Sequence, residues 1–348
     1  MSGALSRRDF LKIGGLSLAA LAFHPFPNHA LPWPPGEPVN RDMTGRVTNK
    51  SVFVYVQPDL NSRRIHKIER DRILPLVEEI TSPYGPAHNP RWYRLFDGYI
   101  HSAHIQRVEN ATLNKPLLSV AESGHLGEVT VPYTQTMYKS RKGFWMPLYR
   151  LYFQSIHWIT GLVESPEGKP WYRLTDEWLK VHYYIPVEHM RVISPEELSP
   201  LSPNVPQTEK RIEISLDRQL LEAYEGNNPV IRTRISSGKR YMETPQGEFQ
   251  VDRKYPSKHM GDGGLTSNLH AYELVGVPWV TFFHRAGIAC HGTFWHDNFG
   301  TPMSRGCINM RNQDAKWLFR WCLPTYDLQI KDRSGWKLTG AGTTVIVT

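Results

Sequence analysis

The sequence contains few cysteines and no apolar run long enough to cross a membrane comfortably, and each scarcity excludes a class of protein. Only 3 of its 348 residues are cysteines, too few for the dense disulfide framework of a small secreted scaffold. The apolar run from Ile13 to Phe23 is shorter than a membrane-spanning helix requires. Basic residues are scattered, without the dense run of a nucleic-acid footprint. We therefore expect no nucleic-acid partner, and membrane contact only through the N-terminal segment.

The residues that are abundant indicate a β-rich protein of several domains. Hydrophobic residues make up 40% of the chain and aromatic residues 11%, as is typical of a globular protein. With 27 prolines and 26 glycines, long helical patterns are scarce, so we expect a mainly β fold. A chain of 348 residues exceeds one ordinary core and predicts two or three domains. The net charge of +8 favours acidic partners such as cell-wall polymers, anionic lipid or nucleic acid, although the scattered basic residues argue against nucleic acid.

The first residues have the pattern of an export address. The segment SRRDFLKIGGLSLAALAF places Arg7 and Arg8 before Phe10-Leu11-Lys12 and a modest apolar run. This pattern resembles a twin-arginine signal, which is read by a receptor. The resemblance predicts export to the periplasm or to the extracellular face of the cell wall, with residues 1–40 as signal and Pro-rich linker. An amphipathic first helix is the alternative, and cleavage or retention of the signal stays open.

A repeat follows the linker. The segment RWYRLFDGYIHSAHIQRV, residues 91–108, aligns with PWYRLTDEWLKVHYYIPVEHMRVI, residues 170–193. Each has a Trp-Tyr-Arg-Leu run near its start and an Arg-Val pair near its end, so the chain contains two copies of one small unit rather than a solenoid. The pattern resembles bacterial SH3-like wall-targeting modules and predicts small SH3-like β-barrels at residues 41–110 and 120–195. The alternative is two ordinary β-hairpins whose tryptophans belong to the core.

A further domain is predicted at residues 208–348, after a Pro/Ser-rich boundary. Its segment RIEISL alternates apolar and polar residues, as a half-buried strand does. One helix is expected, with Asn312 as its N-cap and Pro324 just beyond its end. Its expected apolar face consists of Trp317, Leu318, Trp321 and Cys322.

The segment ACHGTFWHDNFGTPMSRGCINM contains the residues best suited to chemistry. A cysteine attacks as thiolate and needs a base or a cation beside it, and His291 is the obvious base for Cys307. Gly292 lets the backbone approach closely, so its carbonyl could orient the imidazole. The backbone N–H groups of Gly306 and Cys307 could stabilise a tetrahedral oxyanion. On these residues alone, a core cysteine and a capping histidine remain the alternative.

The same segment resembles the signature of the YkuD-type L,D-transpeptidases. That signature is a His-Gly pair, a gap, then Ser/Thr-His-Gly-Cys, a hydrophobic residue and Asn; residues 291–292 and 304–309 fill it here. The segment ETPQGEF, residues 243–249, matches a second family segment. The resemblance covers roughly residues 211–348 and implies a YkuD-type β-sandwich with one main α-helix.

The resemblance also implies roles for single residues. Cys307 would be the nucleophile, His291 the base and Gly292 the carbonyl partner of the base, with no metal and no organic cofactor. Tyr272 is the candidate for the phenol that family members place near the oxyanion.

Several neighbouring residues have more than one interpretation. Arg305 stands where the family usually has His, and it either binds a substrate carboxylate or faces solvent. Ser304 and Asn309 are expected to brace the cysteine loop by hydrogen bonds. The pair His296-Asp297 is expected in a turn lining the cleft rather than in a second catalytic dyad. Cys290 is expected as a buried small hydrophobe, with a disulfide to another cysteine as the alternative.

The function implied by the resemblance is cell-wall chemistry. Cys307 would attack a stem peptide of peptidoglycan at its third residue, expel the terminal D-alanine and transfer the acyl group to an amine of a second stem. Carbapenems would be inhibitors, and the activity would bear on cell-wall organisation and cell shape. The alternatives are an L,D-carboxypeptidase, in which water accepts the acyl group, and a non-catalytic wall-binding protein. The diamino acid and the acceptor stay open.

Overall fold

The computed structural model describes residues 43–109, 111–326 and 342–348. These residues belong to one compact unit, Asp42–Thr348. The predicted signal and linker, residues 1–40, lie outside the described residues. In the part that the structure describes, no helix combines the length and the apolar character needed to cross a membrane.

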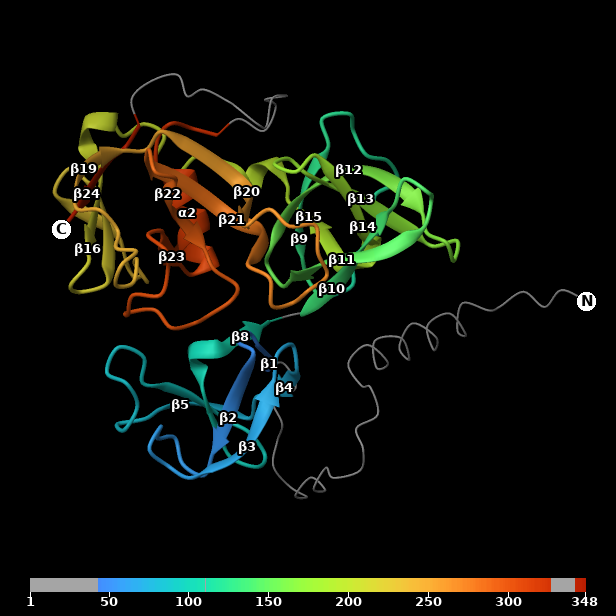
Figure 1. The fold of residues 1–348 in the computed structure, drawn as a ribbon. Helices are drawn as coiled ribbons and strands as arrows, with labels where there is room; N and C mark the ends of the chain where they lie inside the picture. Colours follow the sequence, from blue (N-terminus) through green and yellow to red (C-terminus); the bar gives the residue numbers. More distant parts are fainter. Residues whose placement is uncertain (1–42, 110, 327–341) are drawn as a thin grey trace, which may run out of the picture. The chain divides into compact units, whose positions relative to one another are not determined.

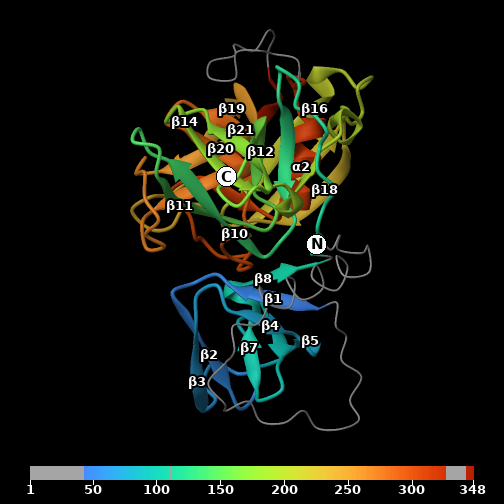
Figure 2. The same ribbon diagram turned by 90° about the vertical axis from the view of Figure 1, so that its right-hand side faces the viewer.

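The first repeat forms two antiparallel sheets (Figures 1 and 2). A three-stranded sheet has the order β4-β1-β8, and a five-stranded sheet has the order β3-β2-β7-β6-β5. Alternate residues of these strands point to one side, and Val47, Val54, Tyr93 and Ile105 meet in a shared core. The elements are β1 (Thr44–Val47), β2 (Ser51–Tyr55), β3 (Arg64–Glu69), β4 (Ile73–Pro75), β5 (Glu78–Thr81), β6 (Arg91–Arg94), β7 (Tyr99–His101), the 3-10 turn η1 (Ser102–His104) and β8 (Ile105–Val108).

The second repeat forms one seven-stranded sheet in the order β11-β10-β14-β13-β12-β9-β15. Its core includes Leu151, Ile159, Tyr172 and Ile185, all fully buried. The elements are β9 (His125–Val129), β10 (Tyr133–Lys139), β11 (Trp145–Tyr152), β12 (Ile156–Glu164), β13 (Pro170–Asp176), β14 (Val181–Pro186), the 3-10 turn η2 (Val187–His189) and β15 (Met190–Val192).

The two repeats share one order of elements after their Trp-Tyr-Arg-Leu runs. In each, the Trp-Tyr-Arg part of the run lies in a strand, an antiparallel strand follows, and a 3-10 turn leads into the strand with the Arg-Val pair. Tyr93 and Tyr172 are both fully buried, whereas Trp92 is buried and Trp171 is partly exposed. The shared order supports an internal repeat. None of the sheets among the described residues closes into a barrel, and the SH3-like assignment stays a prediction.

The C-terminal part consists of two sheets and a helix, and the mainly β prediction is confirmed. A five-stranded sheet has the order β18-β17-β16-β24-β19, and a four-stranded sheet has the order β20-β21-β22-β23. Side chains of both sheets and of helix α2 share one hydrophobic core. The elements are the 3-10 turns η3 (Pro195–Leu198) and η4 (Gln207–Glu209), the strands β16 (Lys210–Ser215), β17 (Leu220–Glu225), β18 (Asn228–Arg234), β19 (Gly247–Gln250), β20 (Arg253–Gly261), β21 (Glu273–His284), β22 (Ile288–Gly292), β23 (Ile308–Met310) and β24 (Thr344–Val347), and the helix α2 (Asn312–Trp321).

The N-cap of helix α2 lies one residue before the predicted one. Arg311 is the N-cap, and Asn312 is the first helical residue. The side-chain amide of Asn312 donates instead to Gln154 Oε1 at 2.9 Å, so this side chain serves a contact with the second repeat. Trp317 is only partly buried, and Phe319 takes its place on the buried face.

Candidate active site

Two neighbouring parallel strands bring His291 and Cys307 to one pocket. Strand β22 ends on His291 and Gly292, and β23 begins directly after Cys307, with His291 in register with Asn309. Both side chains line a pocket of about 590 Å³. Tyr272, Ser304 and Asn309 line the same pocket, as does Arg305.

His291 is held as a neutral imidazole with one nitrogen engaged. Its ring is 2% exposed, and Nδ1 lies 2.9 Å from the carbonyl oxygen of Gly292. Burial lowers the pKa of His291 to about 4, so Nδ1 carries the proton for this hydrogen bond at neutral pH and Nε2 is left as an acceptor. A Cβ on Gly292 would lie 2.3 Å from Asn312 Oδ1, so glycine is needed for this close approach.

Cys307 sits on a loop that Ser304 braces. The N–H of Gly306 donates to Ser304 Oγ at 3.0 Å, and the Ser304 hydroxyl donates to the carbonyl of Cys307. Gly306 has φ +118°, a conformation that L side chains rarely adopt. Because the Gly306 N–H is engaged with Ser304, the predicted pair of oxyanion donors is reduced to the N–H of Cys307.

Thr244 is a supporting residue whose role the sequence did not reveal. Its hydroxyl donates to the carbonyl of Gly306 at 2.7 Å and accepts from the N–H of Gly238 at 3.0 Å. The hydroxyl therefore joins the Gly238 turn to the cysteine loop. The sequence signal for this residue is its place in the segment at residues 243–249, which matches a family pattern without indicating a role for the hydroxyl.

Arg305 and Tyr272 form a contact at the pocket wall. The guanidinium carbon of Arg305 lies 3.9 Å from the centre of the Tyr272 ring. Burial is the main cause that raises the pKa of the Tyr272 hydroxyl, which the nearby Arg305 opposes. The phenol therefore stays protonated at neutral pH and can donate a hydrogen bond.

His296 and Asp297 act separately rather than as a dyad. His296 lines the pocket, is 5% exposed, and its Nε2 lies 2.8 Å from the side-chain amide of Asn309. Burial lowers the pKa of His296 to about 3, so it is neutral. Asp297 instead forms an ion pair with Arg91 of the first repeat.

The segment between His291 and Cys307 rests on the first repeat. Asp297 contacts the first repeat through its backbone as well as through its ion pair. The backbone N–H of Asp297 donates to the carbonyl of Ala103 at 2.8 Å, and the carbonyl of Asp297 accepts from Asn89 Nδ2 at 3.0 Å. These bonds hold the loop that joins the two candidate catalytic residues. The first repeat therefore supports the site directly, a role that no pattern in the sequence indicates.

A buried arginine makes the second link between the first repeat and the site. Arg46 is 2% exposed and lies 2.8 Å from Asp71 in an ion pair. It also donates to the carbonyl of Phe294 at 3.0 Å and to Gln106 Oε1 at 2.7 Å. Burial of a cation is tolerated only where its donors are matched in this way.

Replacement of Asp71 by alanine is expected to lower the free energy of unfolding by about 3 kcal/mol, because one charge of a buried pair is left without its partner. Asp71 also pairs with Arg150 at 2.8 Å, so two cations lose the same carboxylate. The measurement is urea unfolding followed by tryptophan fluorescence, with Asp97→Ala, a substitution of an exposed acid in the same repeat, as the control. If the two variants had the same free energy of unfolding, the buried ion pair would not stabilise the fold as predicted.

The other two cysteines are buried and free. Cys290 lies in β22 at 2% exposure, and Cys322 follows helix α2 at 1%. All three cysteines are unpaired, so Cys290 is the predicted small hydrophobe rather than half of a disulfide. Among the described residues, no group of three His, Cys, Asp or Glu side chains is placed to hold a metal ion.

Alkylation of Cys307 by iodoacetamide is expected to accelerate steadily with pH into the alkaline range. Burial raises the pKa of this thiol, and the neutral His291 offers no positive charge to lower it. The reactive thiolate therefore accumulates only as the pH passes the ordinary cysteine value of about 8.5. Mass gain on the Cys307 peptide, followed over time at several pH values, gives the rates. A rate that is already constant in the acidic range would instead indicate a resting thiolate–imidazolium pair.

The comparisons with known proteins concern the C-terminal part. Residues 209–347 match the family model described as the L,D-transpeptidase catalytic domain, YkuD. A curated relative, the putative L,D-transpeptidase YkuD of Bacillus licheniformis, is 32% identical over 105 residues, which are 30% of this chain and 55% of the relative. The chain thus spans about half the length of the curated relative that it matches.

Solved structures with this similarity include two at 25% identity. The Ldtfm–avibactam carbamoyl enzyme matches over 40% of this chain and 49% of its own, with a TM-score of 0.30. The catalytic domain of the E. faecium L,D-transpeptidase matches over 40% of this chain and 96% of its own, with a TM-score of 0.29. By the family match and the curated relative, residues 209–347 of this chain are similar to the L,D-transpeptidase catalytic domain of the YkuD family.

Proposed function

We propose that the protein is a peptidoglycan L,D-transpeptidase in which Cys307 is the nucleophile and His291 the base. The observation that carries the proposal is that both side chains line one pocket, with the imidazole fixed through Nδ1 on the Gly292 carbonyl. A fixed, neutral imidazole with a free Nε2 is the arrangement that a thiol nucleophile needs. The acyl donor is a stem tetrapeptide, and the acceptor is an amine of a second stem.

The first half of the reaction forms an acyl-enzyme. His291 Nε2 takes the proton of the Cys307 thiol as the sulfur bonds to the carbonyl carbon of the third stem residue. The resulting oxyanion is stabilised by the N–H of Cys307 and by the Tyr272 phenol, which lines the same pocket. When the tetrahedral intermediate collapses, the C–N bond breaks, and His291 returns the proton to the departing amino group of D-alanine. A thioester remains on Cys307.

The second half transfers the acyl group. The amine of a neighbouring stem attacks the thioester carbonyl and gives a proton to His291. The C–S bond then breaks, and the Cys307 sulfur recovers its proton. The product is an amide cross-link between the third residues of two stems. Because β-lactams also carry a reactive acyl group, we propose that carbapenem-type inhibitors acylate Cys307.

Analysis of the products from a purified stem tetrapeptide tests the proposal. Mass spectrometry should find a peptide dimer lacking one D-alanine, together with free D-alanine. A tripeptide without dimer would show that water accepts the acyl group, so the protein would be an L,D-carboxypeptidase. Unchanged tetrapeptide, with the protein still retained on isolated peptidoglycan, would instead leave a non-catalytic wall-binding protein.

We also propose that the protein is exported by the twin-arginine route and that its two repeats bind the cell wall as SH3-like modules. Holding the enzyme on its polymer would raise the local substrate concentration. Pull-down with isolated peptidoglycan tests the binding: residues 43–195 expressed alone should be retained. Loss of retention in that fragment, if it is folded by circular dichroism, would remove the wall-binding role.

A further inference from the structure

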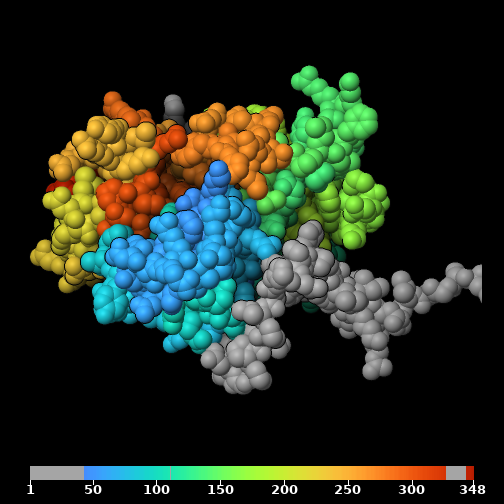
Figure 3. All heavy atoms as spheres, turned by 60° about the horizontal axis from the view of Figure 1, so that its bottom comes forward, coloured from blue at the N-terminus to red at the C-terminus, as the bar shows by residue number. Residues whose placement is uncertain are grey.

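One wall of the pocket that contains Cys307 comes from the first repeat. Arg46, Thr48 and Arg70 line this pocket together with His104, and the second repeat adds Arg150. Figure 3 shows the first repeat, in blue to cyan, beside the orange segment of the C-terminal part, and Arg70 donates to the carbonyl of Leu269 in that segment. The repeats are therefore placed to touch whatever occupies the pocket.

This wall contains more positive charge than its own acids neutralise. Asp71 pairs with Arg46 and with Arg150, at 2.8 Å in each case. Arg70 has no acidic partner among the residues that the structure describes, and it donates a hydrogen bond to the carbonyl of Leu269. The wall thus has three guanidinium groups, and its one carboxylate pairs with only two of them.

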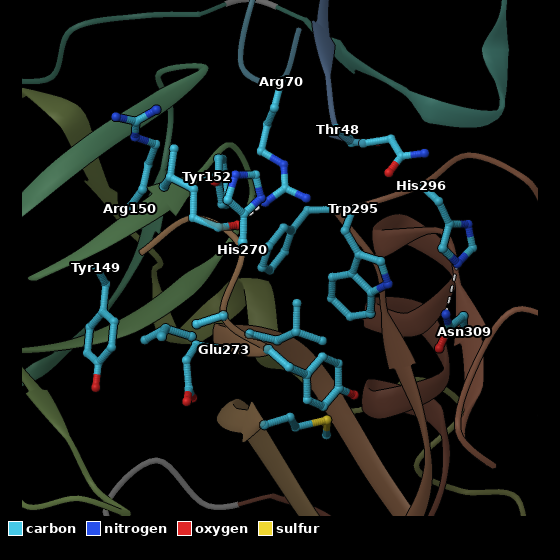
Figure 4. Close-up of a pocket in the computed structure, with 18 of the residues that line it drawn as sticks. Thr48, Arg70, Tyr149, Arg150, Tyr152, His270, Glu273, Trp295, His296 and Asn309 are labelled. Carbon is cyan, nitrogen blue, oxygen red and sulfur yellow. Dashed lines mark hydrogen bonds between the residues drawn. The ribbon is translucent and has the colours of Figure 1, made fainter. Parts of the chain in front are cut away.

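The guanidinium of Arg70 is not fully hydrogen-bonded within the described residues. Its Nε is buried and has no partner among the described residues, although burying an unmatched donor of a cation is costly. Figure 4 shows that the side chains of Arg70 and Trp295 both point into the pocket. An anion that enters the pocket would meet the guanidinium of Arg70, whose charge has no acidic partner among the described residues.

The rest of the pocket does not offset this charge. Lys239 and Arg305 line it as further, exposed cations. The acid among its lining residues is Glu273, which is engaged with His259 Nε2 at 2.8 Å and with the N–H of Gly264. The pocket as a whole therefore favours an anionic occupant.

We propose that Arg70 binds a carboxylate of the peptide substrate, so that the first repeat is part of the substrate-binding cleft and not only a wall anchor. A guanidinium matches a carboxylate through two parallel N–H donors, and stem peptides present free carboxylates. The choice of a peptide carboxylate rests on the proposed function, since the same pocket contains the acyl-transfer residues.

A matched pair of alkylating reagents tests the charge of the pocket without relying on peptidoglycan chemistry. Iodoacetate and iodoacetamide both form an S–C bond at Cys307 and release iodide, but only iodoacetate carries a carboxylate. In Arg70→Gln, the ratio of the iodoacetate rate to the iodoacetamide rate should fall by about threefold or more. Arg63→Gln, which removes the same charge from an exposed site of the same repeat outside the pocket, should leave the ratio unchanged.

A third variant separates the charge of Arg70 from its structural contact. Arg70→Lys keeps the positive charge and should preserve most of the rate ratio, whereas a misfolded site would slow both reagents equally in every Arg70 variant. An unchanged ratio in Arg70→Gln, or an equal loss for both reagents, would overturn the carboxylate subsite.

Steady-state kinetics give the second readout. Arg70→Gln should raise KM about tenfold for a stem tetrapeptide with its free carboxylates, with little change in kcat. The same variant should leave KM unchanged for the peptide whose carboxylates are converted to amides. Absence of D-alanine release from the wild-type protein would refute the proposed function, whereas release with an unchanged KM in Arg70→Gln would refute only the subsite.

Discussion

The variant Cys307→Ala should release D-alanine from a stem tetrapeptide at least about 10⁴-fold more slowly than the wild-type protein. Cys307 supplies the atom that bonds to the donor carbonyl, and alanine has none that could replace it. The position is partly exposed and lines the pocket, so removal of one sulfur should leave the fold intact. Coupled detection of D-alanine, with purified protein in excess, gives the rate.

A second cysteine provides the control. Cys322→Ala removes a buried thiol beyond helix α2, away from the pocket lining, and should keep nearly the full rate. Retention of substantial activity by Cys307→Ala, or an equal loss in Cys322→Ala, would contradict the assignment of the nucleophile.

The variant His291→Gln should lose about 10³-fold in kcat, within the range expected for removal of a general base. Glutamine can occupy similar space and reach the Gly292 carbonyl, but its amide cannot accept the thiol proton. Since burial holds the pKa of His291 at about 4, the wild-type rate near neutral pH depends on a neutral imidazole. The loss should therefore be the same across the neutral range.

A histidine outside the pocket serves as the comparison for this variant. His284→Gln changes a side chain at the end of β21 that accepts the N–H of Ala286, and its kcat should be close to that of the wild-type protein. Recovery of the His291→Gln rate at alkaline pH is also expected, because hydroxide replaces the base in forming the thiolate. A loss in KM alone, with kcat intact, would show that His291 binds substrate instead of moving protons.

The residues at the centre of the site could be predicted from the sequence because local patterns specify them. The Gly residues beside His291 and Cys307 mark places where the backbone comes close or takes a conformation with positive φ. Only glycine fits such a backbone position easily, so each position is marked in the sequence by a glycine within one residue of the catalytic candidate. The bracing role expected for Ser304 agrees with its hydrogen bonds to the cysteine loop.

The contacts of the first repeat with the site could not be predicted in this way. Arg91 and Asp297 form an ion pair across the chain, and Arg46 reaches the carbonyl of Phe294. No pattern in the neighbouring sequence indicates either contact. Each contact joins residues that are far apart in the chain and meet only when the first repeat packs against the C-terminal part. A charged residue in a strand is expected at the surface, so its residue type alone predicts that Arg46 is exposed, whereas it is buried.

Helix α2 shows the limit of local reasoning on a smaller scale. Its position and length were predictable from a capping pattern and an apolar face. The capping position was wrong by one residue because Asn312 has an alternative partner in Gln154 of the second repeat. A side chain that is able to cap a helix can equally serve a distant contact, and only the folded structure decides between them.

The measurement closest to the central claim is the identification of the acyl-enzyme. Purified protein is mixed with stem tetrapeptide without an amine acceptor, quenched in acid and digested for mass spectrometry. A tripeptidyl thioester should be found on the peptide that contains Cys307, with one D-alanine released for each acylated chain. D-alanine release with the acyl group on another residue, or with no protein adduct at all, would contradict a reaction that passes through this sulfur.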